Sequence, residues 1–234
     1  MTEIQEKTVW PSGEGLLKIG ADRPSQDRSR LESECKRRFR EMQTESRLIA
    51  ARSLLRNPDW VGAGSGPEMI TLVELAGSPL DVVPLRAQAK QSWAASSPHA
   101  DGPSCSIYRR LDIEAEPKTF EPGSAILHVT VEVDPDHNAE FLHWYVGQHV
   151  PAIVAAPGII GARRFEEIPV ATDPSHAKTT RRYCTIYEMT HAGVVSQPET
   201  QEASREGACP VELEPYRRAA NQVYDEIFRE LETS

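Results

Sequence analysis

The sequence has few of the residues and patterns on which several common protein classes depend. It contains only 4 cysteines, widely separated and without CxxC or Cys/His finger spacing, which predicts reduced thiols rather than a zinc module or a disulfide framework. No segment approaches the roughly 20 apolar residues of a membrane span, and the N-terminus has no basic region followed by an apolar run. These absences predict a soluble protein of the cytoplasm.

The chain also lacks an excess of positive charge. Its 26 basic and 35 acidic residues give a formal net charge of −9. Because nucleic acids and anionic membranes attract basic surfaces, this balance predicts that neither is the main partner.

The common cofactor and hydrolase motifs are missing as well. The sequence holds no phosphate loop, dinucleotide fingerprint, GxSxG elbow or HExxH motif. His143 and His149 fall on different faces of an expected helix, so a metal held by both is disfavoured. We therefore expect no cofactor and no metal, and a chemistry that needs only an acid or base and a shaped apolar pocket.

The most informative stretch runs from Phe141 to Glu167. Five residues recur at helical spacing on one face: Phe141, Trp144, Tyr145, Gln148 and His149. Pro151 predicts that this helix ends within about a turn of His149. Pro157-Gly158 then predicts a turn before a strand.

This stretch carries the pattern WYxxxHxPxxxxxPGxxxARRF, which begins at Trp144. The pattern resembles the EthD-like branch of the dimeric α/β-barrel superfamily, and the resemblance covers Gly123 to Phe228. It implies a ferredoxin-like fold in which two sheets pack into a barrel. Members of the superfamily include cofactor-independent monooxygenases, lactone isomerases, polyketide cyclases or dehydratases and heme-handling enzymes.

The two halves of the chain show the same order of expected elements. The segment 125–133, AILHVTVEV, alternates as a strand, with Leu127 on its apolar face and His128 on the other. Four residues of the first half match residues of the second half, and the difference in residue number between the matched residues never decreases along the chain. They are Pro24 with Pro135 (135 − 24 = 111), Arg52 with Arg163 (163 − 52 = 111), Glu74 with Glu188 (188 − 74 = 114) and Tyr108 with Tyr224 (224 − 108 = 116).

These observations predict an α+β fold of two tandem ferredoxin-like (βαββαβ) repeats that pack as an intramolecular dimeric α/β-barrel. The expected organisation is a lead-in over 1–13, a degenerate first repeat over 14–115, a linker over 116–122 and a motif-bearing second repeat over 123–234. A monomer then suffices for the fold, and exposed strand edges leave a homodimer open.

His149 is the predicted general acid or base, because an imidazole moves protons near neutral pH. The expected helpers and pocket residues all lie in the second repeat. They are Tyr145 and His128 as helpers, and Phe141, Trp144, Arg163 and Tyr187 as substrate-binding residues. The competing interpretation is that His149 binds a loop carbonyl and holds the helix end, and that Arg163 pairs with Glu166 or Glu167.

The position that matches His149 in the first half is Arg38 (149 − 111 = 38), so the first half has lost the motif. The sequence thus predicts a cofactor-independent isomerase, cyclase, dehydratase or related lyase for a small apolar, aromatic or polyketide-like metabolite. One alternative is a non-catalytic small-molecule-binding or assembly module of the same fold. A second alternative is a cofactor-free monooxygenase or a heme-binding protein.

Overall fold

The computed structural model of the chain describes residues 10–11, 13–21, 28–42, 48–60, 67–77, 82–93, 103–111, 119–120, 122–169 and 180–231. Most of the predicted lead-in (1–13) and linker (116–122), and the landmark Pro24, lie outside these residues. No helix of the described part is long and apolar enough to cross a membrane.

Each half of the chain supplies four long strands and the helices that cover them. The first half contains β2 (Gly15–Ala21), α1 (Arg28–Met42), β3 (Leu48–Arg56), β4 (Met69–Leu75), α2 (Val82–Trp93) and β5 (Ser104–Arg110). The second half contains β7 (Ala125–Val133), α3 (Asn138–Trp144), a π-helical turn (Tyr145–His149), α4 (Val150–Val154), β8 (Ile159–Glu167), β9 (Arg181–Met189), α5 (Pro198–Glu206) and β10 (Arg217–Leu231). Two short strands, β1 (Trp10–Pro11) and β6 (Thr119–Phe120), pair with each other.

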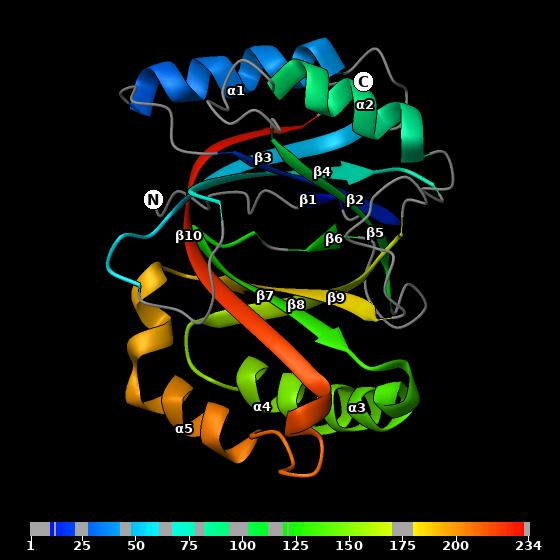
Figure 1. The fold of residues 1–234 in the computed structure, drawn as a ribbon. Helices are drawn as coiled ribbons and strands as arrows, with labels where there is room; N and C mark the ends of the chain where they lie inside the picture. Colours follow the sequence, from blue (N-terminus) through cyan, green and yellow to red (C-terminus); the bar gives the residue numbers. More distant parts are fainter. Residues whose placement is uncertain are drawn as a thin grey trace, which may run out of the picture.

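The long strands form one closed antiparallel barrel in the order β10-β3-β4-β2-β5-β8-β9-β7. Figure 1 shows two facing sheets, with α1 and α2 over the sheet of the first half and α3, α4 and α5 against that of the second. The barrel closes where β5 pairs with β8 and where β10 pairs with β3. Every strand of the barrel has two neighbours in this order, but β5 and β8 pair over only three residues, Tyr108–Arg110 with Phe165–Glu167. The expected homodimer through exposed strand edges stays a prediction.

The strand register confirms the tandem repeat. Strands β3 and β8 have the same length and begin 111 residues apart (159 − 48). Tyr108 pairs with Leu16 of its own half and Glu167 of the other, whereas Tyr224 pairs with Ile126 and Arg56 in the matching places. The barrel is therefore an internal pseudo-dimer of two ferredoxin-like units, as predicted.

The apolar core forms layers inside and outside the barrel. The inner cluster comes entirely from strands: Leu16, Leu54, Ile70, Leu72, Tyr108, Ile126, Phe165, Cys184, Ile186 and Tyr224. The helices pack outside it, where α1 buries Leu31, Cys35, Phe39 and Met42 as its spacing predicts. On β7 Leu127, Val129 and Val131 face the helices, so His128 faces the barrel interior, as expected from the alternation.

A pseudo-symmetric ionic cluster joins the two halves inside the barrel. Arg52 Nη1 donates to both carboxylate oxygens of Glu188 at 2.9 Å, and Arg163 Nη1 donates to Glu74 at 2.6 Å. Arg163 Nη2 also lies 3.3 Å from Glu188. The Arg52–Glu188 and Arg163–Glu74 pairs link one half to the other, and all four residues are 1 to 3% exposed. Arg163 thus pairs with Glu74 and Glu188, two acids that the competing interpretation did not name.

Two matching glycines complete this cluster. The backbone N–H of Gly13 donates to Glu74 at 3.1 Å, and that of Gly123 donates to Glu188 at 3.0 Å. A Cβ on Gly123 would lie 2.1 Å from the carbonyl oxygen of Met189, so no larger residue fits there without a backbone shift. Both carboxylates are thus held by backbone as well as by arginine.

The predicted end of the helix near His149 is wrong. The backbone remains helical through Val154, because the turn over Tyr145–His149 widens into a π-helix. The N–H of Val150 donates to the carbonyl of Tyr145, five residues back. Pro151 sits in the first turn of α4, where proline is tolerated because the missing N–H falls at a helix start.

Candidate active site

A cavity of about 340 Å³ opens inside the barrel. This volume lies at the small end of the range for ligand pockets, which is about 300–1,000 Å³. Six strands supply its lining: Lys18, Ser106, Tyr108, Thr130, Val131, Glu132, Glu167, Arg182, Tyr183, Ala219 and Ala220. The cavity therefore draws on both halves of the chain.

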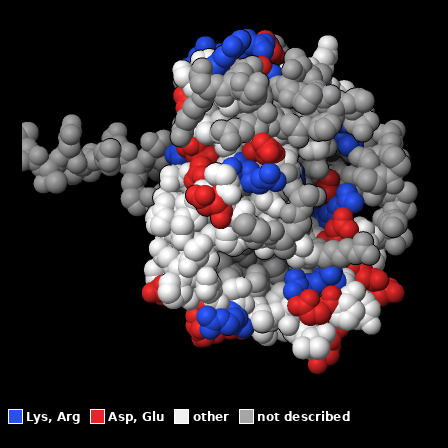
Figure 2. Space-filling view, turned by 60° about the vertical axis from the view of Figure 1, so that its left-hand side comes forward, with Lys and Arg blue, Asp and Glu red and all other residues white. Residues whose placement is uncertain are grey.

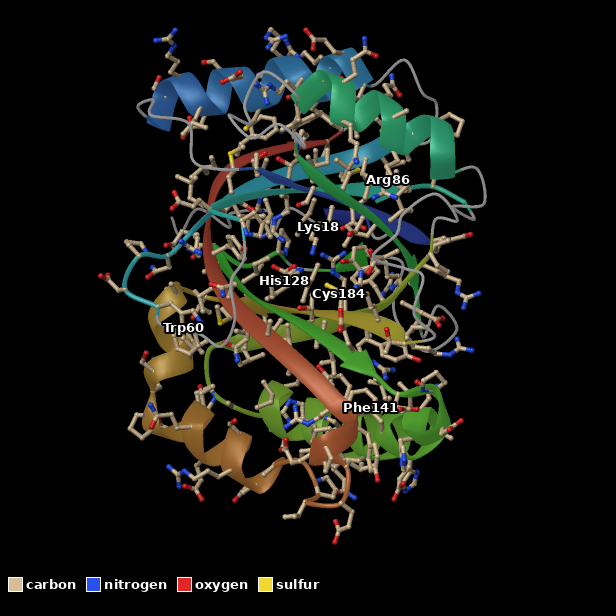
Figure 3. The ribbon with its side chains drawn as sticks, in the orientation of Figure 1. Lys18, Trp60, Arg86, His128, Phe141 and Cys184 are labelled. Carbon is tan, nitrogen blue, oxygen red and sulfur yellow. The ribbon has the colours of Figure 1, made fainter. Side chains whose placement is uncertain are left out.

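Lys18 points into the barrel because of the alternation of β2. Leu17 and Ile19 belong to the outer core beneath the helices, so Lys18 between them faces inward. Its Nζ lies 5.6 Å from the ring centre of Tyr108, and Figure 3 shows it between the two sheets. Burial alone would lower the pKa of Lys18, but Tyr108, Cys184 and Glu167 outweigh burial and raise it. Lys18 is therefore a cation at neutral pH.

Tyr108 stands beside this cation as a neutral phenol. Burial raises the pKa of Tyr108 to about 12, although the charge of Lys18 acts in the opposite direction. At neutral pH its hydroxyl therefore keeps its proton and is able to donate a hydrogen bond to a ligand.

Acidic groups lie on the part of the lining that comes from the second half. Arg182 Nε donates to Glu132 at 2.8 Å, and Arg182 Nη1 lies 3.8 Å from Glu167. The side chain of Glu167 is only 8% exposed, against 37% for Glu132. Glu167 is therefore the carboxylate held deeper in the barrel and the better placed general base.

His128 and Cys184 form a second polar pair inside the barrel. Their Nε2 and Sγ atoms lie 3.3 Å apart, and the His128 ring meets Tyr224 edge-on at 6.2 Å. Burial, followed by the charge of Lys18, holds the pKa of His128 well below its usual value. Burial raises the pKa of Cys184 to about 12 despite Lys18. The pair is thus neutral and does not form a reactive thiolate.

His149 lies in the helical layer outside the barrel, not in the lining of this cavity. Its ring stacks on Tyr145 at 5.0 Å, and its Nδ1 lies 2.7 Å from the carbonyl oxygen of Gly207. Because a carbonyl only accepts, Nδ1 carries the proton and the imidazole is fixed in one tautomer. Burial lowers the pKa of His149, with the Gly207 bond opposing and Arg217 adding to the shift. This contact is the loop-carbonyl anchor of the competing interpretation.

The first half has an analogous contact at the matching position. Arg38 is 1% exposed and stacks over Trp93, the last residue of α2, at 5.5 Å from the ring centre. His149 binds Gly207, which directly follows α5, the matching helix. In both halves this position ties the first helix to the end of the second, which favours a structural contribution from His149.

The other predicted site residues divide between the helical layer and the barrel. Phe141, Trp144 and Tyr145 form an aromatic cluster with His149, and Tyr145 Oη donates to Thr185 at 2.9 Å. Tyr187 packs below this layer with Ile153 and Ala203. His128 and Arg163 lie inside the barrel instead, so the predicted set does not converge on one cavity.

Lys18, Tyr108 and Glu167 are the pocket residues that sequence reasoning did not select as a site. The usable signal was the position of Lys18 within GLLKIGA, a run whose other residues are all apolar or glycine. A strand apolar on both faces is buried on both faces, so a lysine in its middle must face a protein interior. Within the described ranges, no group of three or more histidine, cysteine or acidic side chains is arranged to hold a metal ion.

Acidic and basic side chains lie next to one another on the face that Figure 2 shows, with no broad area of one sign among the described residues. The charges on this face thus single out no partner, and the barrel cavity carries the candidate chemistry.

No protein-family model matches the sequence, and no curated protein matches it at a significant level. Solved structures do match the fold over nearly the whole chain. A variant of DypB from Rhodococcus jostii in complex with heme is 11% identical, with a TM-score of 0.56 over 92% of this chain and 93% of that one. A candidate chlorite dismutase is 12% identical, with a TM-score of 0.57 over 92% and 95%.

A candidate monooxygenase from Fusobacterium nucleatum is 10% identical, with a TM-score of 0.51 over 95% of this chain and 96% of that one. At such identities the likeness concerns the fold alone. It supports the dimeric α/β-barrel architecture, and the EthD-like branch stays a prediction.

Proposed function

We propose that this protein is an enzyme that transforms a small, largely apolar metabolite inside the barrel by acid–base chemistry. The class is the one that the sequence predicts: an isomerase, cyclase, dehydratase or related lyase without a redox cofactor. The observation that carries the proposal is a cavity that presents a cation, Lys18, a neutral phenol, Tyr108, and a carboxylate, Glu167.

These three groups suit proton abstraction next to a carbonyl. Glu167 would take the proton from carbon, and the electron pair of the broken C–H bond would move onto the carbonyl oxygen. Tyr108 would donate a hydrogen bond to that oxygen, and Lys18 would stabilise its negative charge. Return of the proton to another carbon completes an isomerisation, whereas loss of a neighbouring hydroxyl as water completes a dehydration.

The cavity does not fit a heme. Heme iron takes an axial ligand from histidine, cysteine, methionine or a tyrosine phenolate. The described lining contains none of the first three, and its two tyrosines stay protonated, because burial raises the pKa of Tyr108 to about 12 and also raises the pKa of Tyr183. His149, the predicted acid–base residue, lies outside the lining. We therefore derive no step through a heme.

Exchange of carbon-bound protons tests the proposal directly. We expect the protein to speed deuterium incorporation into 2-tetralone, a bicyclic ketone with acidic protons, in deuterated buffer. Glu167→Gln should lower this rate about 10²- to 10⁴-fold, the usual contribution of a positioned base. Glu41→Gln, an exposed change on α1, is the matched control.

Saturable binding of 2-tetralone without faster exchange would instead support the alternative, a non-catalytic binding module. One observation favours keeping this alternative. The ionic cluster of Arg52, Arg163, Glu74 and Glu188 fills part of the barrel interior with side chains that already satisfy one another.

A further inference from the structure

Lys18 is a cation inside the barrel whose charge is not paired. Among the residues that the structure describes, no carboxylate lies within ion-pair distance of its Nζ, and Glu167 acts on it only at longer range. A charge that is partly removed from water and has no ion-pair partner costs free energy, which a partner of opposite charge recovers. The ammonium faces the cavity, so a ligand is able to supply that partner.

Hydrogen-bond donors surround this cation. Ser106 is the direct neighbour of Lys18 in the β2–β5 ladder, so both side chains lie side by side on the inner wall. The hydroxyls of Tyr108 and Thr130 line the same cavity. The other cation of the lining, Arg182, is already engaged by Glu132 at 2.8 Å. The free positive charge of the described lining is therefore concentrated at Lys18.

We propose that the substrate binds as an oxyanion, a phenolate, enolate or carboxylate on a small apolar ring, with its charged oxygen on Lys18 Nζ and Ser106 Oγ. This inference rests on the proposed function, because it specifies the ligand of the same cavity. Ala220, on the same side of β10 as Tyr224 of the inner cluster, supplies small apolar surface for the ring. The volume of about 340 Å³ favours a ligand of one or two rings.

Three probes with the same ring separate charge from shape. 4-Nitrophenol, which ionises near neutral pH, offers a phenolate, 4-nitrobenzoate offers a carboxylate, and 4-nitroanisole is their neutral counterpart. Dissociation constants are measured by absorbance and calorimetry on the full chain, at a pH where nitrophenol is mostly ionised. The variants are Lys18→Met, Lys18→Arg and the exposed control Lys36→Met.

We expect at least one anion to bind about 10- to 100-fold more tightly than 4-nitroanisole, as a charge-assisted hydrogen bond to a partly buried cation would give. The protein should also lower the pH at which bound nitrophenol ionises. Lys18→Met should abolish both effects, whereas Lys18→Arg should retain the preference for an anion and Lys36→Met should change nothing. A preference for the phenolate assigns an enolate-like substrate, and a preference for 4-nitrobenzoate assigns a carboxylate.

Equal binding of charged and neutral probes would overturn the inference, as would an anion preference that survives in folded Lys18→Met. Failure to bind any of the three would overturn it as well. The proposed function fails separately, because 2-tetralone is neutral and its exchange depends on Glu167. Exchange without anion preference would leave an enzyme whose substrate enters uncharged.

Discussion

The substitution Glu188→Gln removes a buried carboxylate that binds one arginine from each half of the barrel. Both oxygens of Glu188 accept from Arg52, one also accepts from Arg163, and the other accepts the N–H of Gly123. The side chain is 3% exposed, so water does not replace these partners. A neutral amide would leave buried guanidinium groups with less opposite charge than they now have.

The expected loss of stability follows from this burial. Breaking a buried ion pair by removing one partner costs about 3–5 kcal/mol, because an uncompensated charge stays behind. For a chain of this size about 1 kcal/mol shifts the melting temperature by about 2–4 °C, so Tm should fall by about 6–20 °C. Arg52→Met should cost more than Arg163→Met, since Arg52 also pairs with Glu226 and donates to Gly123 O.

Urea unfolding followed by circular dichroism measures these differences. The control is Arg37→Met, which removes one member of an exposed pair with Glu41 on α1 and should cost less than about 1 kcal/mol. If Glu188→Gln cost no more than this control, the cluster would not hold the two halves together and our energetic reasoning would be wrong.

Three further predictions concern other parts of the molecule. His149→Ala should lower the free energy of unfolding by about 1–3 kcal/mol, because it leaves the carbonyl of Gly207 without its hydrogen bond. The rate of 2-tetralone exchange per folded molecule should stay unchanged. A loss of exchange at unchanged Tm would contradict this prediction. The pKa of His128 is lower in the folded state than in the unfolded chain. As the pH drops below about 6.5, the unfolded chain therefore takes up a proton that the folded protein does not, and stability should fall. His128→Gln should flatten that fall in urea titrations from pH 5 to 8, and an unchanged slope would count against it. Finally, residues 1–115 and 123–234 expressed separately should associate, and two stable monomers that do not combine would refute the shared barrel.

The tandem repeat could be predicted from the sequence because the buried ionic contacts of the barrel require the same residue types at matching positions of the two halves. Arg52 matches Arg163 and Glu74 matches Glu188 because each arginine forms the same buried ionic contact with the glutamate of the other half. Such residues change less readily than surface residues, since replacing one partner leaves a buried charge. The ladder of β7 was equally readable, because its alternation separates the helix-facing and barrel-facing sides.

The candidate site was harder to predict from the sequence, because its residues are far apart in the chain and none of them indicates a functional site by itself. Lys18, Tyr108 and Glu167 come together only when β2, β5 and β8 become neighbours in the closed barrel. The prominent motif around His149 instead describes how a helix packs on its sheet. Pro151 misled the prediction of the helix end, since a π-turn places it at the start of a new helical segment.

The central claim is that the barrel cavity, not the aromatic cluster at His149, is where this protein meets its ligand. The most direct measurement is a crystal structure of the protein soaked with 4-nitrophenol near the pH at which the probe ionises. We expect ligand density inside the barrel, with the probe's oxygen in contact with Lys18 Nζ. Density confined to the helical layer beside His149, with the cavity at Lys18 unchanged, would contradict it.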